Sequence, residues 1–366
     1  MTPDDALLAL AHVVEPGDER IGRMVDSLGP EAVIARLRDG ARGDGPAQGL
    51  QARLDAFDRA RAQAAARDAQ ARIVLRDSPE WPSQLDHLGP ARPFALWVVG
   101  GPHLRLAALQ SVAVIGARAS TAYGERLAHD WTASLADAGW TVVSGGAHGI
   151  DGAAHRGALA AGGVTICVLA SGVDVAYPRA HAALIARIAD TGLLVSESPP
   201  GSSARRQRFL TRNRIIAALT RGTVVIEAAL RSGTTSTANA AHALNRPVLA
   251  APGPVTSPMS AGCHQLIRDQ RAVLASQWGD VVDLLGAIGD GDGDVDRAIP
   301  PAAPTDALTH GQRLVLDALP LRTGLALDAV VRESGLSASA ALACLGVLTA
   351  AGLAEQRGDT WRAVRV

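Results

Sequence analysis

The sequence contains no lysine, and all 35 of its basic side chains are arginines. A chain without lysine has no P-loop lysine and cannot form a Schiff base, which excludes the usual ATP-binding loop and pyridoxal-dependent catalysis. Cysteine is also scarce, since Cys167, Cys263 and Cys344 are spread too widely for a disulfide framework or a structural zinc site. We therefore predict a protein that uses no cofactor and no metal.

Long apolar stretches are absent too. The longest runs, such as residues 162–169, have the length of a β-strand and fall far short of the ~20 residues that a membrane-spanning helix needs. The segment Met1 to Asp5 is acidic where a secretory signal carries basic residues. These features predict a soluble, cytoplasmic protein with no membrane partner.

Aromatic residues make up only 3% of the chain, so its core must be built from alanine, valine, leucine and isoleucine. Hydrophobic residues nevertheless reach 48%, against 19% charged residues, which is a balance typical of folded chains. The net charge of −1 excludes a uniformly basic surface, so any anion-binding site must be a local patch. A length of 366 residues predicts two or three domains.

The spacing of apolar residues divides the chain into four parts. Residues 1–68 have helical spacing and are predicted to form a small helical (SAM-like) module. Residues 70–285 alternate short apolar runs with helical stretches, and residues 286–306 are acidic and glycine-rich, then proline-rich, which is typical of a linker. In residues 307–366, helical stretches precede a predicted hairpin, which is the pattern of a winged-helix domain.

The central part contains apolar runs of strand length, which we predict at 112–115, 141–143, 164–169, 193–195, 224–226 and 248–250. Continuous apolar strands that alternate with helices indicate a parallel sheet covered by helices on both faces. The predicted fold class is therefore α/β. In such sheets ligands bind beside the carboxyl ends of the strands, and glycines and small polar residues follow several of these ends.

Three of these strand ends carry a candidate anion-binding loop. The first begins at Gly116 and contains Arg118 and Ser120, so that backbone N–H groups and a guanidinium are available for a phosphate. The second is Ser144-Gly145-Gly146, whose glycines let the backbone approach a ligand closely. The third contains Ser232-Gly233, just before a predicted helix. For each loop the alternative is a plain turn or helix cap.

The most informative segment lies between Glu197 and Glu227, because it contains arginines and no acid, a local charge of +6. Its arginines are Arg205, Arg206, Arg208, Arg212, Arg214 and Arg221. Phe209 lies among them, and guanidinium groups together with a ring face are what single-stranded nucleic acid requires for its phosphates and bases. The alternative is a solvated charge run on a loop and helix.

Several motifs, in one order over residues 70–280, resemble the DNA-processing protein A (DprA/Smf) family of bacteria. They are Val114-Ile115-Gly116-x-Arg118 with Tyr123-Gly124, Ser144-Gly145-Gly146-x-x-Gly149-Ile150-Asp151 with His155, Gly172-x-Asp174-x-x-Tyr177-Pro178, Ser196-Glu197, Phe209-x-x-Arg212-Asn213-Arg214-Ile215-Ile216, Glu227-Ala228 with Ser232-Gly233, and Pro252-Gly253. Each motif alone is weak, but their combination is specific. The sequence departs from the family pattern at His148, Leu210 and Arg271, where arginine, proline and glycine are common.

The resemblance implies an extended Rossmann-like domain that binds single-stranded DNA as a homodimer and catalyses no reaction. Family members protect incoming DNA and load the RecA recombinase onto it during natural transformation, so RecA is an implied partner. The family's strand-binding arginine corresponds to Arg118, the basic residue before its stacking phenylalanine to Arg206, and the phenylalanine itself to Phe209. Further DNA contacts are expected from Gly116, Ser120, Ser144, Gly145, Gly146, Arg212, Asn213, Arg214, Ser232 and Gly233.

Two other functions stay open on the sequence alone. A nucleotide phosphoribohydrolase of the lysine-decarboxylase-like fold carries a Pro-Gly-Gly-x-Gly-Thr-x-x-Glu signature. Residues 231–237 have its Gly-Thr but neither the leading glycines nor the final glutamate that would act as a general acid. A Rossmann/winged-helix transcription regulator needs a basic recognition helix, yet residues 337–352 contain no arginine.

Overall fold

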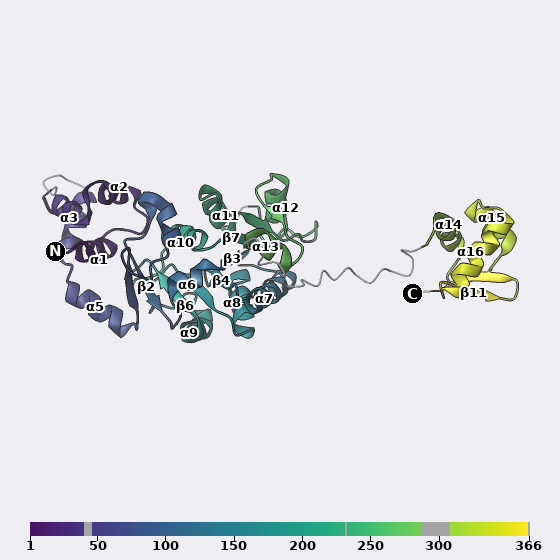
Figure 1. The fold of residues 1–366 in the computed structure, drawn as a ribbon, viewed down its shortest axis with the longest axis horizontal. Helices are drawn as coiled ribbons and strands as arrows, with labels where there is room; N and C mark the ends of the chain where they lie inside the picture. The colour runs from purple at the N-terminus through teal and green to yellow at the C-terminus, as the bar shows by residue number, and fades with distance from the viewer. Residues whose placement is uncertain (40–45, 231–232, 287–307, 365–366) are drawn as a thin grey trace. The chain divides into compact units, whose positions relative to one another are not determined.

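The structure is a computed structural model, and it describes all residues except 40–45, 231–232, 287–307 and 365–366. The described residues fall into two compact units, one within Met1–Asp292 and the other within Gly293–Val366 (Figure 1). Apart from Gly286, the predicted linker 286–306 lies outside the described residues. The predicted domain boundaries remain predictions.

The N-terminal residues have the helical character that the sequence predicts. Their helices are α1 (Pro3–Val13), α2 (Glu19–Leu28), α3 (Pro30–Asp39), α4 (Pro46–Asp55) and α5 (Arg59–Asp68). Side chains fix where some of them begin: Thr2 forms a capping box with Asp5 before α1, and Asp18 accepts a backbone N–H bond before α2. Buried residues of α1 to α4 share a core with Trp97 and Leu194 of the larger sheet.

The larger sheet has, among the described residues, nine strands in the order β1-β2-β6-β5-β4-β3-β7-β8-β9. The strands are β1 (Arg72–Leu75), β2 (Ala95–Val99), β3 (Ser111–Ile115), β4 (Thr141–Ser144), β5 (Thr165–Leu169), β6 (Leu193–Ser196), β7 (Gly222–Val225), β8 (Val248–Ala250) and β9 (Val273–Leu274). In the run β6-β5-β4-β3-β7-β8-β9 every pair of neighbouring strands is parallel. This confirms the predicted α/β class with its parallel sheet.

One edge of the sheet adds two antiparallel strands that the sequence did not predict. Strand β1 pairs antiparallel with β2, and β2 pairs antiparallel with β6. The segment between β1 and β2 contains the 3₁₀ segment η1 (Ser83–Ala91) and no crossover α-helix, so the chain returns in the opposite direction. The sheet is therefore mixed, with its parallel part in the centre.

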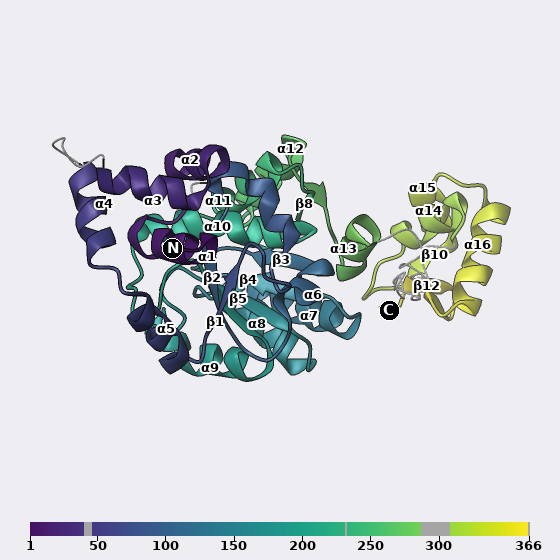
Figure 2. The same ribbon diagram turned by 60° about the vertical axis from the view of Figure 1, so that its left-hand side comes forward.

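Helices cover both faces of this sheet (Figure 2). Successive side chains of a strand point to opposite faces, so a strand that is apolar throughout needs cover on both. Val112 and Val114 of β3 pack on one side, and Ala113 and Ile115 on the other. The first face is covered by α7 (Ala122–Asp137), α8 (Ile150–Ala160), α9 (Ala182–Thr191) and α13 (Trp278–Leu285). The second is covered by η1, α6 (Leu104–Leu109), α10 (Arg206–Leu219), α11 (Thr234–Ala243) and α12 (Ala261–Arg268).

The N-terminal helices lie at the β1–β2 edge and contact elements of both faces. Helix α1 shares the core of the first face. Helix α2 packs against η1, where Gly22 leaves no room for a side chain beside the carbonyl of Pro90, and Asp26 pairs with Arg92. This position brings the segment between α1 and α2 next to α10.

The unit within Gly293–Val366 contains, where it is described, α14 (His310–Ala318), α15 (Leu327–Ser334), α16 (Ala338–Ala350) and a small sheet of β10 (Leu325–Ala326), β11 (Ala354–Arg357) and β12 (Thr360–Ala363) in the order β10-β12-β11. These helices and the β11–β12 hairpin lie where the sequence predicts them, whereas the winged-helix assignment stays a prediction. No single helix of the described residues is long and apolar enough to span a membrane, and α15 with α16 passes that test only as a pair bent by 102°.

Candidate nucleic-acid interface

A pocket of about 700 Å³ lies at the carboxyl ends of the parallel strands. Its walls come from the segments that follow β3, β4, β5, β6, β7 and β8 and from α10. This is the edge at which α/β sheets bind ligands. The predicted site residues that line the pocket are Gly116, Arg118, Arg206, Phe209, Arg212, Asn213 and Gly233.

Helix α10 contributes the largest share of these residues, and it presents two rows of side chains. Arg206, Phe209 and Asn213 follow one another at intervals of three and four residues, so they lie on one helix face, toward the pocket. Arg205 and Arg208 lie on a neighbouring face, toward the N-terminal helices. The C-terminal half of α10 is buried against the sheet, which holds both rows in place.

An arginine and two aromatic rings meet on the pocket wall. The guanidinium carbon of Arg118 lies 5.2 Å from the centre of the Phe209 ring. The ring of Tyr177 lies 5.2 Å from that of Phe209, centre to centre, with 53° between their planes. Arg118 and Tyr177 are exposed and Phe209 is half-buried. The structure thus brings together a cation and ring faces, as the sequence predicts for Arg118 and Phe209.

Tyr177 belongs to one of the family motifs but was not predicted to be a site residue. It follows β5 at the same sheet edge as Arg118, and it lines the pocket. The chain has only two tyrosines. An aromatic residue in the segment that follows a buried strand was therefore a usable signal, but its pairing with Phe209 depends on the path of the chain after β5.

The arginine cluster is not free of acidic partners, which corrects the inference from its local charge. Arg208 donates two hydrogen bonds to Glu15, at 3.1 and 3.2 Å. Arg214 pairs with Glu197 at 2.7 Å, with both side chains largely buried. Arg221 donates to backbone carbonyls at the opposite end of the strands, away from the pocket. Glu15 and Glu197, which lie outside the acid-free segment, thus offset the charges of Arg208 and Arg214.

Arg212 is buried beneath the loop that follows β4. Its Nη1 donates to the carbonyl of Val168 at the end of β5, and its Nε has no hydrogen-bond partner among the described residues. Asp151, which accepts backbone N–H bonds from Gly145 and Ala147, interacts electrostatically with it. Burial raises the pKa of Asp151, although Arg212 opposes the shift, and burial lowers the pKa of Arg212. Arg212 therefore forms a cationic part of the pocket floor.

The loop after β3 is held by a buried carboxylate. Glu227, at the end of β7, accepts hydrogen bonds from the backbone N–H of Thr121, at 2.9 Å, and from its hydroxyl. Gly116 lies so close to Ile150 that a larger residue would clash. These contacts fix the loop that presents Arg118. Ser120 donates instead to Glu125 at 2.7 Å and does not line the pocket.

The second predicted loop supports the pocket more than it lines it. The hydroxyl of buried Ser144 donates to the carbonyl of Val114 on the neighbouring strand, at 2.6 Å. Gly146 has a φ of +68°, and a side chain there would also meet Cys167. Ser144, Gly145, Gly146 and Arg214 are not among the residues that line the pocket. Ser232 lies outside the described residues.

The family model for DNA recombination-mediator protein A matches residues 72–286. This chain belongs to the DNA recombination-mediator protein A family. Family members are also named DprA or Smf. The resemblance seen in the motifs is thereby confirmed, and the family's role in DNA processing and recombination applies to it.

Individual DprA proteins match over most of the chain. A Mycobacterium tuberculosis (strain H37Rv) protein named as DNA processing protein DprA is 43% identical, over 97% of this chain and 93% of that protein. The X-ray structure of DprA from Streptococcus pneumoniae has a TM-score of 0.67 at 30% identity and covers 78% of this chain and 99% of its own. A structure that concerns the single-stranded DNA binding mode of DprA from Helicobacter pylori has a TM-score of 0.53 at 28% identity, over 59% and 97%.

Proposed function

We propose that this protein binds single-stranded DNA in the pocket at the carboxyl ends of β3 to β8, without sequence preference and without catalytic turnover. The observation that carries the proposal is the position of Arg118 beside the rings of Phe209 and Tyr177. A ring face stacks on any base, and a guanidinium binds any phosphate, so the combination suits a single strand of any sequence. The Helicobacter pylori relative binds single-stranded DNA, which supports the proposal.

Each pocket residue has a distinct proposed role. Arg118 and exposed Arg206 bind phosphates, and Phe209 stacks on a base with Tyr177 beside it. Asn213 lies one turn after Phe209, where its amide is available to a base edge, and Gly116 and Gly233 let the strand approach the backbone. Buried Arg212 adds positive charge to the pocket floor. We propose supporting roles for Ser120, Ser144, Gly145, Gly146 and Arg214, and retain Ser232 as a proposed contact.

The carboxylates at this edge support a binding function over glycosidic cleavage. Asp151 accepts two backbone N–H groups and Glu227 holds Thr121, so both are engaged by donors of the protein itself. A general acid must instead be free to reach a leaving group. Incubation with AMP should release no adenine above background. Release that depends on Asp151 would favour the phosphoribohydrolase alternative.

The DNA-binding proposal is tested by fluorescence anisotropy with matched single-stranded and duplex oligonucleotides over a series of salt concentrations. We expect tighter binding of the single strand, with an affinity that falls as salt rises because bound arginines release counterions. Equal affinity for a blunt duplex, or no dependence on salt, would contradict the proposal.

Membership of the family supports a finer proposal about the partners. We propose that the protein acts as a homodimer that protects incoming strands and loads RecA onto them during natural transformation. Purified protein should then have twice the mass of one chain in light scattering, and it should accelerate RecA filament formation on single strands. A monomer with no effect on RecA would contradict this finer proposal and leave the strand-binding proposal standing.

A further inference from the structure

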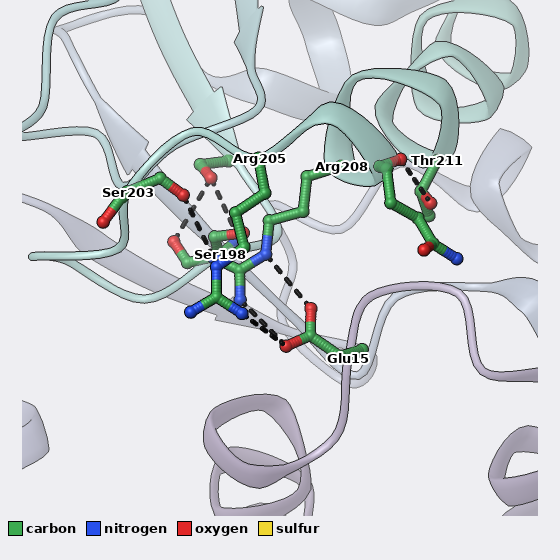
Figure 3. Close-up of polar contacts among 8 residues, drawn as sticks. Glu15, Ser198, Ser203, Arg205, Arg208 and Thr211 are labelled. Carbon is green, nitrogen blue, oxygen red and sulfur yellow. Dashed lines mark hydrogen bonds and ion pairs between the residues drawn. The ribbon is translucent and has the colours of Figure 1, made fainter.

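Glu15 lies in the segment between α1 and α2 and reaches α10 from the N-terminal helices (Figure 3). Its two carboxylate oxygens accept from Nε and Nη2 of Arg208, at 3.1 and 3.2 Å, and Nη1 of Arg205 lies 3.9 Å from it. The hydrogen bond from Arg208 lowers the pKa of Glu15, so the carboxylate is charged at neutral pH. An anion is therefore held beside the first turn of the helix that carries Phe209.

This contact differs from the other ion pair of α10 in the exposure of its carboxylate. The Glu15 side chain is 50% exposed, that of Arg205 69% and that of Arg208 15%, whereas the side chains of Arg214 and Glu197 are 13% and 10% exposed. Exposed ion pairs contribute little net stability, because water solvates both charges well when they separate. Removing one partner of a buried pair is costly. Because Glu15 and Arg205 are open to solvent, water or another anion can replace the Glu15 carboxylate more readily than Glu197.

The geometry at Glu15 is also the geometry of phosphate binding. A guanidinium binds phosphate and carboxylate oxygens through the same two parallel N–H groups, and Glu15 already takes both from Arg208. Arg205 precedes Arg206, which lines the pocket. A strand whose base stacks on Phe209 and whose phosphate contacts Arg206 therefore needs only a short continuation to reach Arg205 and Arg208.

We propose that Arg205 and Arg208 form a second phosphate site on α10, which Glu15 occupies in the free protein and the backbone of single-stranded DNA takes over. Glu15 then acts as a competitor that lowers affinity for strands that extend beyond the pocket. This inference rests on the proposed binding of single-stranded DNA.

The segment that carries Glu15 is anchored independently of its carboxylate. Gly17 has a φ of +77° and lies against Thr211 and Arg214 of α10, where a side chain would clash. Asp18 caps α2, and Asp26 of α2 pairs with Arg92. Removing the charge of Glu15 should therefore leave the N-terminal helices in place and free only the two arginines.

The test compares Glu15→Gln with Glu19→Gln, a matched control that removes the same charge. Glu19 lies four residues later, is 58% exposed and pairs with Arg23, away from α10. With an oligonucleotide of about 20 nucleotides, Glu15→Gln should bind about fivefold more tightly than Glu19→Gln. This factor corresponds to about 1 kcal/mol, the free energy of an ion pair near the surface that the strand no longer has to break. With a strand of about four nucleotides, near the lower end of known site sizes, the two variants should bind equally.

A further pair of substitutions identifies the source of the gain. Adding Arg205→Gln and Arg208→Gln to the Glu15→Gln variant should abolish the gain in affinity. Urea unfolding checks that this triple variant remains folded. If Glu15→Gln binds the long strand like Glu19→Gln, or more weakly, Glu15 is a structural anchor and the inference is wrong. If the wild-type protein binds no single strand at all, the proposed function fails first, so the two failures are distinguishable.

Discussion

The guanidinium of Arg212 occupies the space that a side chain at Gly145 would need. The two residues come from different elements, since Gly145 follows β4 and Arg212 lies in α10. This close contact between α10 and the loop after β4 leaves no room for a side chain at position 145. It explains why that residue is a glycine although it does not line the pocket.

Gly145→Ala should therefore destabilise the protein by about 1–3 kcal/mol, because the added methyl group overlaps the buried guanidinium of Arg212 and forces it to move. Urea unfolding measures the change. Gly101→Ala is the control, since nothing lies within 4 Å of the position that its Cβ would take. Equal stability of the two variants would show that Arg212 moves aside without cost.

Substitution of Arg214 should mainly change stability, and substitution of Arg206 should mainly change strand binding. Arg214→Ala leaves the largely buried Glu197 without its partner and should cost about 3 kcal/mol of unfolding free energy. Arg206→Ala removes an exposed side chain on the pocket wall, so it should weaken strand binding and leave stability unchanged. The measurements are urea unfolding and anisotropy on both variants. A stable Arg214→Ala variant with weak binding would make Arg214 a direct DNA contact.

His155 should make stability depend on pH. Its Nδ1 lies 2.8 Å from the hydroxyl of Thr165, which donates to Val142, and its Nε2 has no hydrogen-bond partner in the part of the chain that the structure describes. Burial lowers the pKa of His155 from 6.5 to about 3, and Arg212, His181 and Arg156 add to the effect. Between these pH values the unfolded chain binds a proton that the folded chain does not, so stability falls as pH falls below 6.5.

The expected size of this effect is about 2 kcal/mol between pH 7 and pH 5, from 1.36 kcal/mol for each pKa unit. Comparison of wild-type protein with His155→Gln, by urea unfolding at both pH values, isolates it from the other titrating groups. Asp151, whose pKa burial raises, titrates in both proteins and largely cancels in the difference. An identical pH dependence for the two proteins would show that folding leaves the pKa of His155 unchanged.

Removal of all residues after about 300 should leave strand binding intact. The described residues of Met1–Asp292 form one compact unit that contains the whole pocket. Helix α16 carries no charged side chain with which to bind phosphate. Anisotropy on the truncated protein measures the effect. A folded truncated protein that loses most of its affinity would assign DNA contacts to the C-terminal unit.

The sequence predicted the central strands because they depend on local pattern, whereas a joint site of Arg118 and Phe209, which lie far apart in the chain, was implied by the resemblance to the family. Apolar runs identify buried strands, and the ends of parallel strands necessarily share one edge. Strand β2 was not predicted although its five residues are an apolar run like the others, and such a run carries no information about the direction of the strand.

The partners of the arginines could not be predicted either. Glu15 and Arg208 are 193 residues apart, and their contact exists only because the N-terminal helices pack at the β1–β2 edge. Local charge counts cannot detect such pairs. The sequence therefore located the arginine cluster. Only the structure shows that Arg206 lies on the pocket wall and Arg212 in its floor, while Arg208 and Arg214 have acidic partners.

The central claim is that a cation and a ring face form one binding site, and a salt series on Arg118→Ala and Phe209→Ala tests it most directly. Phe209→Ala should lose about 1–3 kcal/mol of binding free energy with an almost unchanged salt slope, because stacking releases no counterions. Arg118→Ala should weaken binding and reduce the slope by about 0.7, the value for one phosphate contact on a single strand. Unfolding midpoints equal to wild type would exclude a folding defect. Folded variants that bind with the affinity and slope of the wild-type protein would contradict the account.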